Sequence, residues 1–288
     1  MNGQIIKVIS NDYTVKLENN EKIVCKARGV FRNKNITPLA GDYCFVDEKN
    51  KLITEIFDRK NSLNRPPVSN IDAALILMST INPDFSITLL DKMITIIEYN
   101  NIEPVIVISK TDLLFNDDIK SVMDYFKNIG YKVFLNSEVE DILQYIENKT
   151  VILTGQSGSG KSSLLNKIDS SLNLKTDEIS KALGRGKHTT RAVTFYEIGT
   201  SLIADTPGFS ALSFVDMSKE NIRDCFNEFN TYRDRCKYRD CMHIKEDECE
   251  IKRLVSEGKI NKERYNDYID FIKEKENEGI SFNIKGKK

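Results

Sequence analysis

The first 65 residues alternate between apolar and polar positions in five short runs, which is the pattern of half-buried strands. Asn, Asp and Gly separate the runs, and these residues favour turns. Five short strands in about sixty residues predict a small β-barrel of the OB type, although an SH3-like barrel would give the same pattern. The runs cover residues 4–9, 13–17, 22–27, 43–47 and 52–57.

The pattern changes after Asn64-Arg65-Pro66-Pro67, which we interpret as a linker because Pro ends strands and disfavours helix. Residues 71–79 form a nearly continuous apolar run, as expected for a strand that is buried on both faces. Helical spacing follows in residues 89–97 and again in 119–129. This alternation predicts an α/β domain with a largely parallel sheet. Its other predicted strands are residues 105–109, 132–135, 151–154 and 201–204.

Beyond about residue 215 no strand pattern remains, and the chain is polar and helical. Tyr265, Tyr268, Ile269 and Ile272 give one predicted helix an apolar face. The fold class is therefore multidomain. We expect an OB-type barrel in residues 1–65, an α/β domain in 66–215 and a mostly α-helical domain in 216–288.

A phosphate-binding loop follows the predicted strand 151–154 and precedes a helix-like run. Residues 155–162 match G-x-x-x-x-G-K-[ST] at every fixed position. The glycines let backbone N–H groups point at phosphate oxygens, Lys161 reaches the β- and γ-phosphates, and the Ser162 hydroxyl ligates Mg²⁺. We count Lys161 among the catalytic residues as well. The predicted nucleotide contacts of this loop are Gly155, Gln156, Ser157, Gly158, Ser159, Gly160, Lys161, Ser162 and Ser163.

A second phosphate-side element, Asp205-Thr206-Pro207-Gly208, follows the predicted strand 201–204. Asp205 at a strand end is placed to bind Mg²⁺, directly or through water. Gly208 can offer its N–H to a γ-phosphate because no side chain blocks the approach. D-x-x-G is weak evidence alone and strong evidence beside the phosphate loop.

The element Ser109-Lys110-Thr111-Asp112 ends a buried strand and resembles the N/T-K-x-D element of GTPases. The Asp112 carboxylate can accept two hydrogen bonds from guanine, and adenine does not present that pair of donors. Lys110 would pack its stem along the base. Ser109 replaces the commoner Asn, so a weaker tie between this loop and the phosphate loop is expected. Asn136-Ser137 is a weaker candidate for a further base-contacting loop.

These motifs occur in permuted order, because the guanine element at 109–112 precedes the phosphate loop at 155–162. Most GTPases place the phosphate loop first. A circular permutation of the same sheet leaves the site geometry intact. It also puts residues 205–208 directly before the C-terminal domain, and we hypothesise that γ-phosphate sensing is coupled to that domain.

Four of the six cysteines are crowded into the C-terminal part. Cys236, Cys241, His243 and Cys249 supply three thiols and one imidazole, an established ligand set for tetrahedral zinc. Four protein ligands leave no open position, so one structural Zn²⁺ is predicted. The alternative is reduced cysteines beside a surface histidine. Basic residues alternate around this cluster and are candidates for contacts with RNA phosphates.

Together these features resemble the ribosome small-subunit-dependent GTPase A family of circularly permuted bacterial GTPases. The resemblance covers nearly the whole chain, from the barrel through residues 109–112, 155–162, 184–190 and 205–208 to the Cys/His tail. It implies an OB-fold, a permuted GTPase domain and a zinc-binding domain. It also implies that GTP, bound with Mg²⁺, is hydrolysed to GDP and phosphate with stimulation by the 30S subunit during its late maturation. The implied partners are the 30S subunit and its 16S rRNA, and a monomer is expected.

The first switch is expected at residues 184–190, between the phosphate loop and D-x-x-G. Thr189 and Thr190 are both candidates to ligate Mg²⁺, and the family pattern favours Thr190. Phe209 stands where many GTPases carry a water-orienting Gln, so intrinsic hydrolysis should be slow. His188 is the candidate catalytic group in its place; contact with RNA phosphate or local packing is the alternative.

Composition narrows the remaining possibilities. The net charge is −1, with 12 Lys/Arg against 8 Asp/Glu in residues 1–65, which permits nucleic-acid binding without requiring it. No apolar run approaches the ~20 residues needed to cross a bilayer, and the N-terminus lacks a secretory pattern, so no membrane partner and a cytoplasmic location are expected.

Three other functions are alternatives to the 30S-dependent GTPase. A P-loop kinase or ATPase conflicts with Asp112 and the D-x-x-G element. A non-enzymatic RNA-binding module conflicts with the complete set of nucleotide motifs. A regulatory P-loop NTPase that acts on another RNA target is the main alternative.

Overall fold

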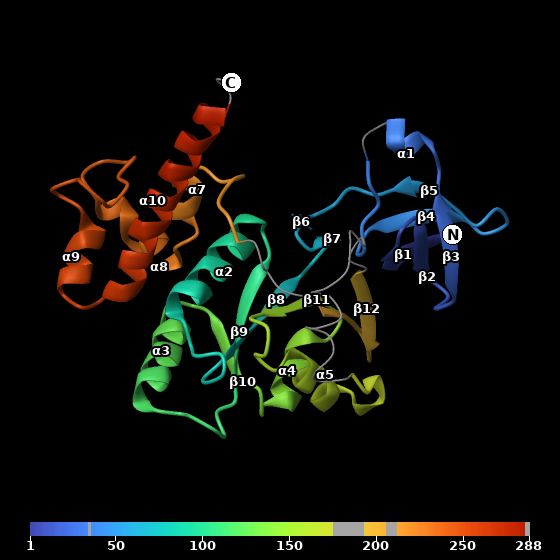
Figure 1. The fold of residues 1–288 in the computed structure, drawn as a ribbon, viewed down its shortest axis with the longest axis horizontal. Coiled ribbons are helices and arrows are strands. Elements are labelled where there is room, and N and C mark those ends of the chain that lie inside the picture. Colours follow the sequence, from blue (N-terminus) through green and yellow to red (C-terminus); the bar gives the residue numbers. More distant parts are fainter. Residues whose placement is uncertain (34–35, 175–192, 206–211, 286–288) are drawn as a thin grey trace.

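The computed structural model describes residues 1–33, 36–174, 193–205 and 212–285. Figure 1 shows an elongated molecule with a β-barrel at one end, helices at the other end, and an α/β sheet between them. This arrangement confirms the predicted multidomain fold class.

The N-terminal barrel is built from five strands in the order β1-β2-β3-β5-β4, and pairing between β1 and β4 closes it. Only β3 and β5 run parallel, with the short helix α1 (Val30–Asn33) between β3 and β4. This connectivity makes the barrel OB-type rather than SH3-like. The strands are β1 (Asn2–Ile9), β2 (Asp12–Leu17), β3 (Lys22–Ala27), β4 (Tyr43–Asp47) and β5 (Leu52–Ile56).

The segment that we predicted as a linker forms a small hairpin instead. Strands β6 (Ser62–Asn64) and β7 (Pro67–Ser69) pair antiparallel across Arg65-Pro66. Pro67 begins its strand, a position where the missing N–H is tolerated. Asn61 fixes this hairpin to the α/β sheet, because its side chain donates to the carbonyls of Ile71 and Asn101 at 2.7 and 3.0 Å.

The central sheet has the order β10-β9-β8-β11-β13-β12. Its first five strands are parallel, and β12 runs antiparallel to β13. The pattern-based strands were found within a few residues of their predicted bounds, whereas β12 was not predicted. The strands are β8 (Ala73–Ser79), β9 (Glu103–Ser109), β10 (Lys132–Leu135), β11 (Thr150–Gly155), β12 (Val193–Ile198) and β13 (Ser201–Asp205).

Helices cover both faces of this sheet. Ala74, Ile76 and Met78 of β8 share a core with α2 (Ile87–Tyr99) and α3 (Asp117–Asn128). The alternate residues of β8, Ala73, Leu75 and Leu77, share a second core with α4 (Val139–Ile146) and α5 (Lys161–Ile168). Because successive side chains of a strand point to opposite faces, a strand packed on both sides reads as a continuous apolar run.

The barrel and the central sheet are continuous. Strand β1 pairs antiparallel with β12 through Lys7–Thr194 and Val8–Val193. Ile6 of β1 joins the same hydrophobic core as Phe195 of β12. The two parts of the chain therefore share both backbone hydrogen bonds and apolar packing.

Within the described residues 212–285, the chain forms helices only, packed around one core that contains Phe214, Phe226, Phe229 and Phe271. The long helix α10 lies against α2 of the central sheet (Figure 1). No helix in the described part of the chain is both long and apolar enough to span a membrane. The helices are α7 (Lys219–Asp224), α8 (Asn227–Tyr232), α9 (Glu250–Ser256) and α10 (Lys262–Lys285).

Candidate functional site

Four neighbouring strands, β9, β8, β11 and β13, end at the same edge of the sheet because they run parallel. The guanine element follows β9, the phosphate loop follows β11, and Asp205 is the last residue of β13. Ligands of open α/β sheets bind at this carboxyl edge. The fold therefore brings together motifs that are about a hundred residues apart in the sequence.

The backbone of the phosphate loop depends on its glycines. Gly155 has φ +143°, and a Cβ placed on it would lie 2.2 Å from the Leu77 carbonyl oxygen of the adjacent strand. Gly158 and Gly160 also have positive φ, at +82° and +95°. Side-chain-bearing residues rarely adopt these angles, so the predicted motif corresponds to a real steric requirement.

Helix α5 begins at Lys161, immediately after Gly160. The Lys161 ammonium group folds back and donates hydrogen bonds to the carbonyls of Gly155 and Gln156, at 2.9 and 2.7 Å. The positive charge that is predicted to bind the phosphates therefore lies against the backbone of the phosphate loop. Ser162 is the next residue of the first turn and is half-buried, as is Lys161.

Ser109 connects the guanine element to the phosphate loop. Its side chain is buried, and its hydroxyl donates to the Ser159 carbonyl at 2.6 Å. The two loops are thus tied together with Ser at this position, because the short hydroxyl reaches the neighbouring loop directly; that the tie is weaker than one made by Asn stays a prediction. Asp112, three residues further along, is exposed and free to face a base.

Two further residues that support the guanine element were not predicted. The Thr80 hydroxyl donates to the Lys110 carbonyl at 2.9 Å, and the Lys110 ammonium group donates to the Asn82 carbonyl. Lys110 itself has φ +59°. Both supporting residues follow β8, the strand between β9 and β11, and their place after a buried strand was the available signal.

The other predicted site residues fall in different places. Asn136 follows β10 at the same edge, where its N–H donates to the Ile108 carbonyl at 2.8 Å. Asp205 pairs in register with Leu153 of β11. His188, Thr190, Gly208 and Phe209 lie outside the described residues.

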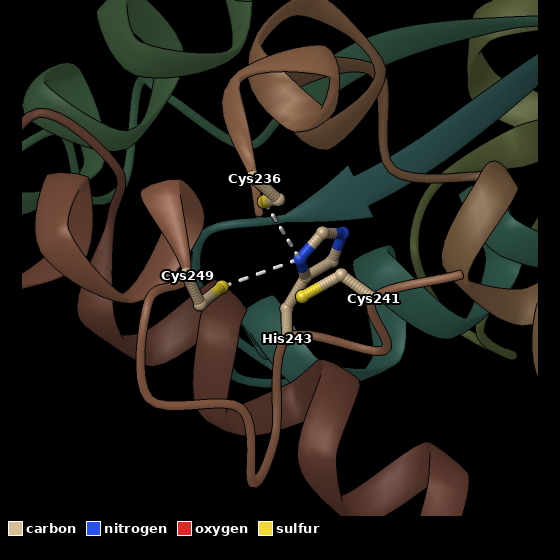
Figure 2. A group of neighbouring side chains, drawn as sticks. All are labelled: Cys236, Cys241, His243 and Cys249. Carbon is tan, nitrogen blue, oxygen red and sulfur yellow. Dashed lines mark hydrogen bonds between the residues drawn. The ribbon is translucent and has the colours of Figure 1, made fainter. Parts of the chain in front are cut away.

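A second cluster lies in the C-terminal part, where Cys236, Cys241, His243 and Cys249 place their ligand atoms within 4.8 Å of one another. Figure 2 shows one nitrogen of the imidazole facing the sulfur atoms of Cys236 and Cys249. Its Nδ1 lies 3.6 Å from the Cys236 sulfur and 3.3 Å from the Cys249 sulfur. Tetrahedral zinc, with Zn–S bonds of about 2.3 Å and Zn–N bonds of about 2.0 Å, requires N···S separations of ~3.5 Å. The four residues therefore fit this ion.

The local structure presents His243 as a neutral ligand. Burial lowers the pKa of His243 to about 4, and the nearby Arg223 acts in the same direction. Tyr265 donates to the His243 carbonyl and Tyr268 donates to the Met242 carbonyl, both at 2.6 Å, so α10 holds this loop in place. Cys249 precedes the first residue of α9, which fixes the last thiol at a helix start.

Comparison with known proteins agrees with this geometry. The family model described as RsgA GTPase matches residues 56–215, and that of the RsgA N-terminal domain matches residues 2–52. The chain is 47% identical to small ribosomal subunit biogenesis GTPase RsgA 2 of Oceanobacillus iheyensis, covering 94% of this chain and 96% of the relative. It is 42% identical to small ribosomal subunit biogenesis GTPase RsgA of Bacillus subtilis, with the same coverage.

Solved structures give the same result. The crystal structure of YloQ, a circularly permuted GTPase, superposes with a TM-score of 0.81 at 36% identity, over 96% of this chain and 95% of that one. YjeQ from Thermotoga maritima superposes with a TM-score of 0.79 at 31% identity, over 95% and 97%. The chain therefore belongs to the RsgA family of circularly permuted GTPases.

Proposed function

We propose that this protein hydrolyses GTP and that this reaction assists the biogenesis of the small ribosomal subunit. The observation that carries the nucleotide part is the hydrogen bond between the Ser109 hydroxyl and the Ser159 carbonyl. It joins the base-reading element to the phosphate loop, so that one rigid edge can hold both ends of a guanine nucleotide. The exposed carboxylate of Asp112 argues against a kinase or ATPase, because adenine does not present the pair of donors that this carboxylate can accept.

Each residue has a defined task in this reaction. Asp112 selects guanine, and the N–H groups of the phosphate loop hold the phosphates in place. Lys161 exchanges its two carbonyl partners for the β- and γ-phosphates, where it neutralises negative charge as the terminal phosphoryl group leaves. Water attacks that group, and GDP and phosphate are released.

Magnesium, when bound, would neutralise part of the negative charge on the phosphate oxygens. We assign Ser162 and Thr190 as its protein ligands, with Asp205 close to it, directly or through water. Gly208 senses the γ-phosphate. His188 orients the attacking water, because Phe209 cannot.

The ribosomal part of the proposal rests on the relatives, which are named small ribosomal subunit biogenesis GTPases. We assign the 30S subunit as the partner that stimulates hydrolysis and its 16S rRNA as the contacted nucleic acid. We further propose that the protein acts in the cytoplasm, where such a partner is found, and that it acts as a monomer. The barrel (1–65), the GTPase domain (66–215) and the zinc-binding domain (216–288) are the proposed units.

One structural Zn²⁺ is proposed for the C-terminal unit, held by Cys236, Cys241, His243 and Cys249. The observation that supports it is the buried imidazole whose Nδ1 faces two thiols at hydrogen-bond range. A closed Cys₃His set leaves no position for a substrate. The ion would hold together the loop between α8 and α9.

The proposal is tested by GTP turnover of the purified protein alone and with saturating 30S subunits. Slow turnover alone and strong stimulation by 30S is the expected result, with GDP but not ADP competing for the site. Stimulation by an unrelated structured RNA, and none by 30S, would replace the ribosome with another RNA target. Equal competition by ADP would reject the guanine assignment.

A further inference from the structure

One arginine is completely buried where the C-terminal helices meet the GTPase sheet. Arg264 of α10 is 0% exposed and pairs with two carboxylates on other elements. Its Nη1 donates to Asp91 of α2, and its Nε donates to Glu228 of α8 at 2.6 Å. The guanidinium carbon also lies 4.7 Å from the centre of the Phe226 ring. This ion network is sealed from water by aromatic rings.

A third carboxyl group enters the same site from α10. Asp267 is 8% exposed, and its Oδ1 accepts a hydrogen bond from the Thr88 hydroxyl at 2.8 Å. The other oxygens, Asp91 Oδ2 and Asp267 Oδ2, are buried and accept no hydrogen bond from an N–H or O–H group of the described residues. The two carboxyl groups lie close enough for each to influence the titration of the other. A hydrogen bond between them needs a proton, because two carboxylates have no donor between them.

The charge balance supports a bound proton. Asp91, Glu228 and Asp267 carry three negative charges when ionised, and Arg264 supplies one positive charge. Uncompensated charge in a buried site is costly, and protonation is the usual way to remove it. Burial raises the pKa of Asp91 to about 8; Asp267 and Glu228 add to that increase, and Arg264 opposes it. Burial also raises the pKa of Asp267, and Asp270 adds to that increase; hydrogen bonding with Thr88 and Asp91 and the charge of Arg264 oppose it.

The remaining groups around the pair do not cancel the excess of negative charge. From α3 and the turn after it, Tyr125 and Tyr131 face the network, and burial raises the pKa of both phenols. On α2, burial likewise raises the pKa of Glu98. Lys92 is the nearest ammonium group on that helix, and it is already paired with Glu274 of α10 at 2.6 Å.

We propose that Asp91 and Asp267 share one proton, and that this proton is a pH-sensitive latch that holds the C-terminal zinc-binding unit against the GTPase domain. Below the titration of the pair, the proton completes a hydrogen bond across the interface. Above it, two carboxylates face each other beside an arginine that is already shared with Glu228. The docked arrangement therefore weakens as pH rises, while the nucleotide site at the carboxyl edge of the sheet keeps its own contacts.

Two isosteric variants test the latch in the full-length protein. Asp91→Asn and Asp267→Asn each replace one carboxyl by an amide, which donates to the remaining carboxylate without a titrating proton. Both should fold. The exposed Asp124→Asn on α3 is the matched control, since it removes the same charge from a neighbouring helix outside the network. Unfolding by urea is measured at pH 6, 7, 8 and 9 and is followed by circular dichroism.

Where only the folded state holds the proton, the unfolding equilibrium constant of the wild type relative to either variant should rise about tenfold per pH unit. This window lies above the ordinary carboxyl range and ends near pH 8, the raised value for Asp91. The sign follows because the proton stabilises the folded form and is lost as pH rises. Infrared spectroscopy at pH 7 should show the carbonyl stretch of a protonated carboxylic acid in the wild type and in Asp124→Asn. That band should be absent from both other variants.

A purely structural role for the two aspartates would give a different result. Both variants would then lose stability by the same amount at every pH, with wild-type slope. Equal slopes, or an infrared band that persists in Asp91→Asn and Asp267→Asn, would overturn the proposal. GTP turnover is not needed for either measurement, so the test stands independently of the proposed function.

Discussion

The Ser109 hydroxyl donates a 2.6 Å hydrogen bond to the carbonyl of Ser159, and this bond spans the site from the guanine element to the phosphate loop. Both residues are buried, so the bond is not exchanged with water. This bond therefore fixes the spacing between the parts of the site that hold the base and the phosphates.

Ser109→Ala should weaken GDP and GTP binding by roughly tenfold, because one buried hydrogen bond between the two loops is lost. Equilibrium binding of a fluorescent GDP analogue measures the effect. Ser256→Ala, which removes a hydroxyl from the exposed side of α9, is the control and should bind normally. Normal affinity in Ser109→Ala would show that the two loops hold their relative position without this bond.

Guanine specificity should depend on Asp112. Asp112→Asn removes the charged acceptor of two hydrogen bonds, so GTP affinity should fall, while xanthosine triphosphate, with its C2 oxygen, becomes relatively better bound. Competition between the two nucleotides gives the specificity ratio. An unchanged ratio would mean that another residue reads the base.

Gly155→Ala should abolish nucleotide binding. Its methyl group would lie 2.2 Å from the Leu77 carbonyl oxygen, a backbone atom that cannot move away without distorting β8. Gly258→Ala is the control for backbone strain alone. Gly258 also has a positive φ, +72°, but a Cβ placed on it would meet no other atom within 4 Å. The control should lose about 1–2 kcal/mol of stability and no nucleotide affinity. Binding by Gly155→Ala would show that the loop has another backbone conformation in solution.

Removal of zinc should loosen the C-terminal unit selectively. Protein purified without added metal should contain about one zinc equivalent, and Cys241→Ser should contain little. Proteolysis should then begin in the segment between α8 and α9, whereas GDP affinity stays within roughly twofold because those residues do not touch the phosphate loop. If the wild-type protein contained no zinc and its C-terminal unit still resisted protease, zinc would have no structural role there.

His188→Ala should leave GTP binding nearly intact and lower the 30S-stimulated rate by ~10²-fold, the usual cost of losing a group that positions a nucleophile. The two measurements are GTP affinity and turnover with saturating 30S subunits. Full stimulation of the variant would transfer the catalytic role to the ribosome.

The positions of Ser109, Gly155 and Asp205 in the fold were predictable because each one ends a buried strand, and strand ends are local features of the sequence. Two elements were missed although their patterns were present. Residues 139–146 carry apolar positions at helical spacing, and residues 193–198 form a short strand that follows the predicted first switch in the sequence. The hairpin of β6 and β7 was missed because Pro67 was treated only as a strand breaker, although it can begin one.

The buried network around Arg264 could not be predicted from the sequence. In a polar helix an arginine looks solvent-exposed, and its partners Asp91 and Glu228 lie 173 and 36 residues away. Nothing local encodes such a pairing. It exists because the fold brings α2, α8 and α10 together in three dimensions.

The pairing of β1 with β12 also bears on how the chain can be divided. A truncated protein that begins after the barrel would leave β12 as a bare sheet edge, with Val193 and Phe195 no longer covered by Ile6. Exposed apolar edges recruit other strands, and self-association follows. The barrel therefore covers the open edge of the central sheet. A GTPase fragment that stays monomeric would have to retain β1 or carry charged substitutions along β12.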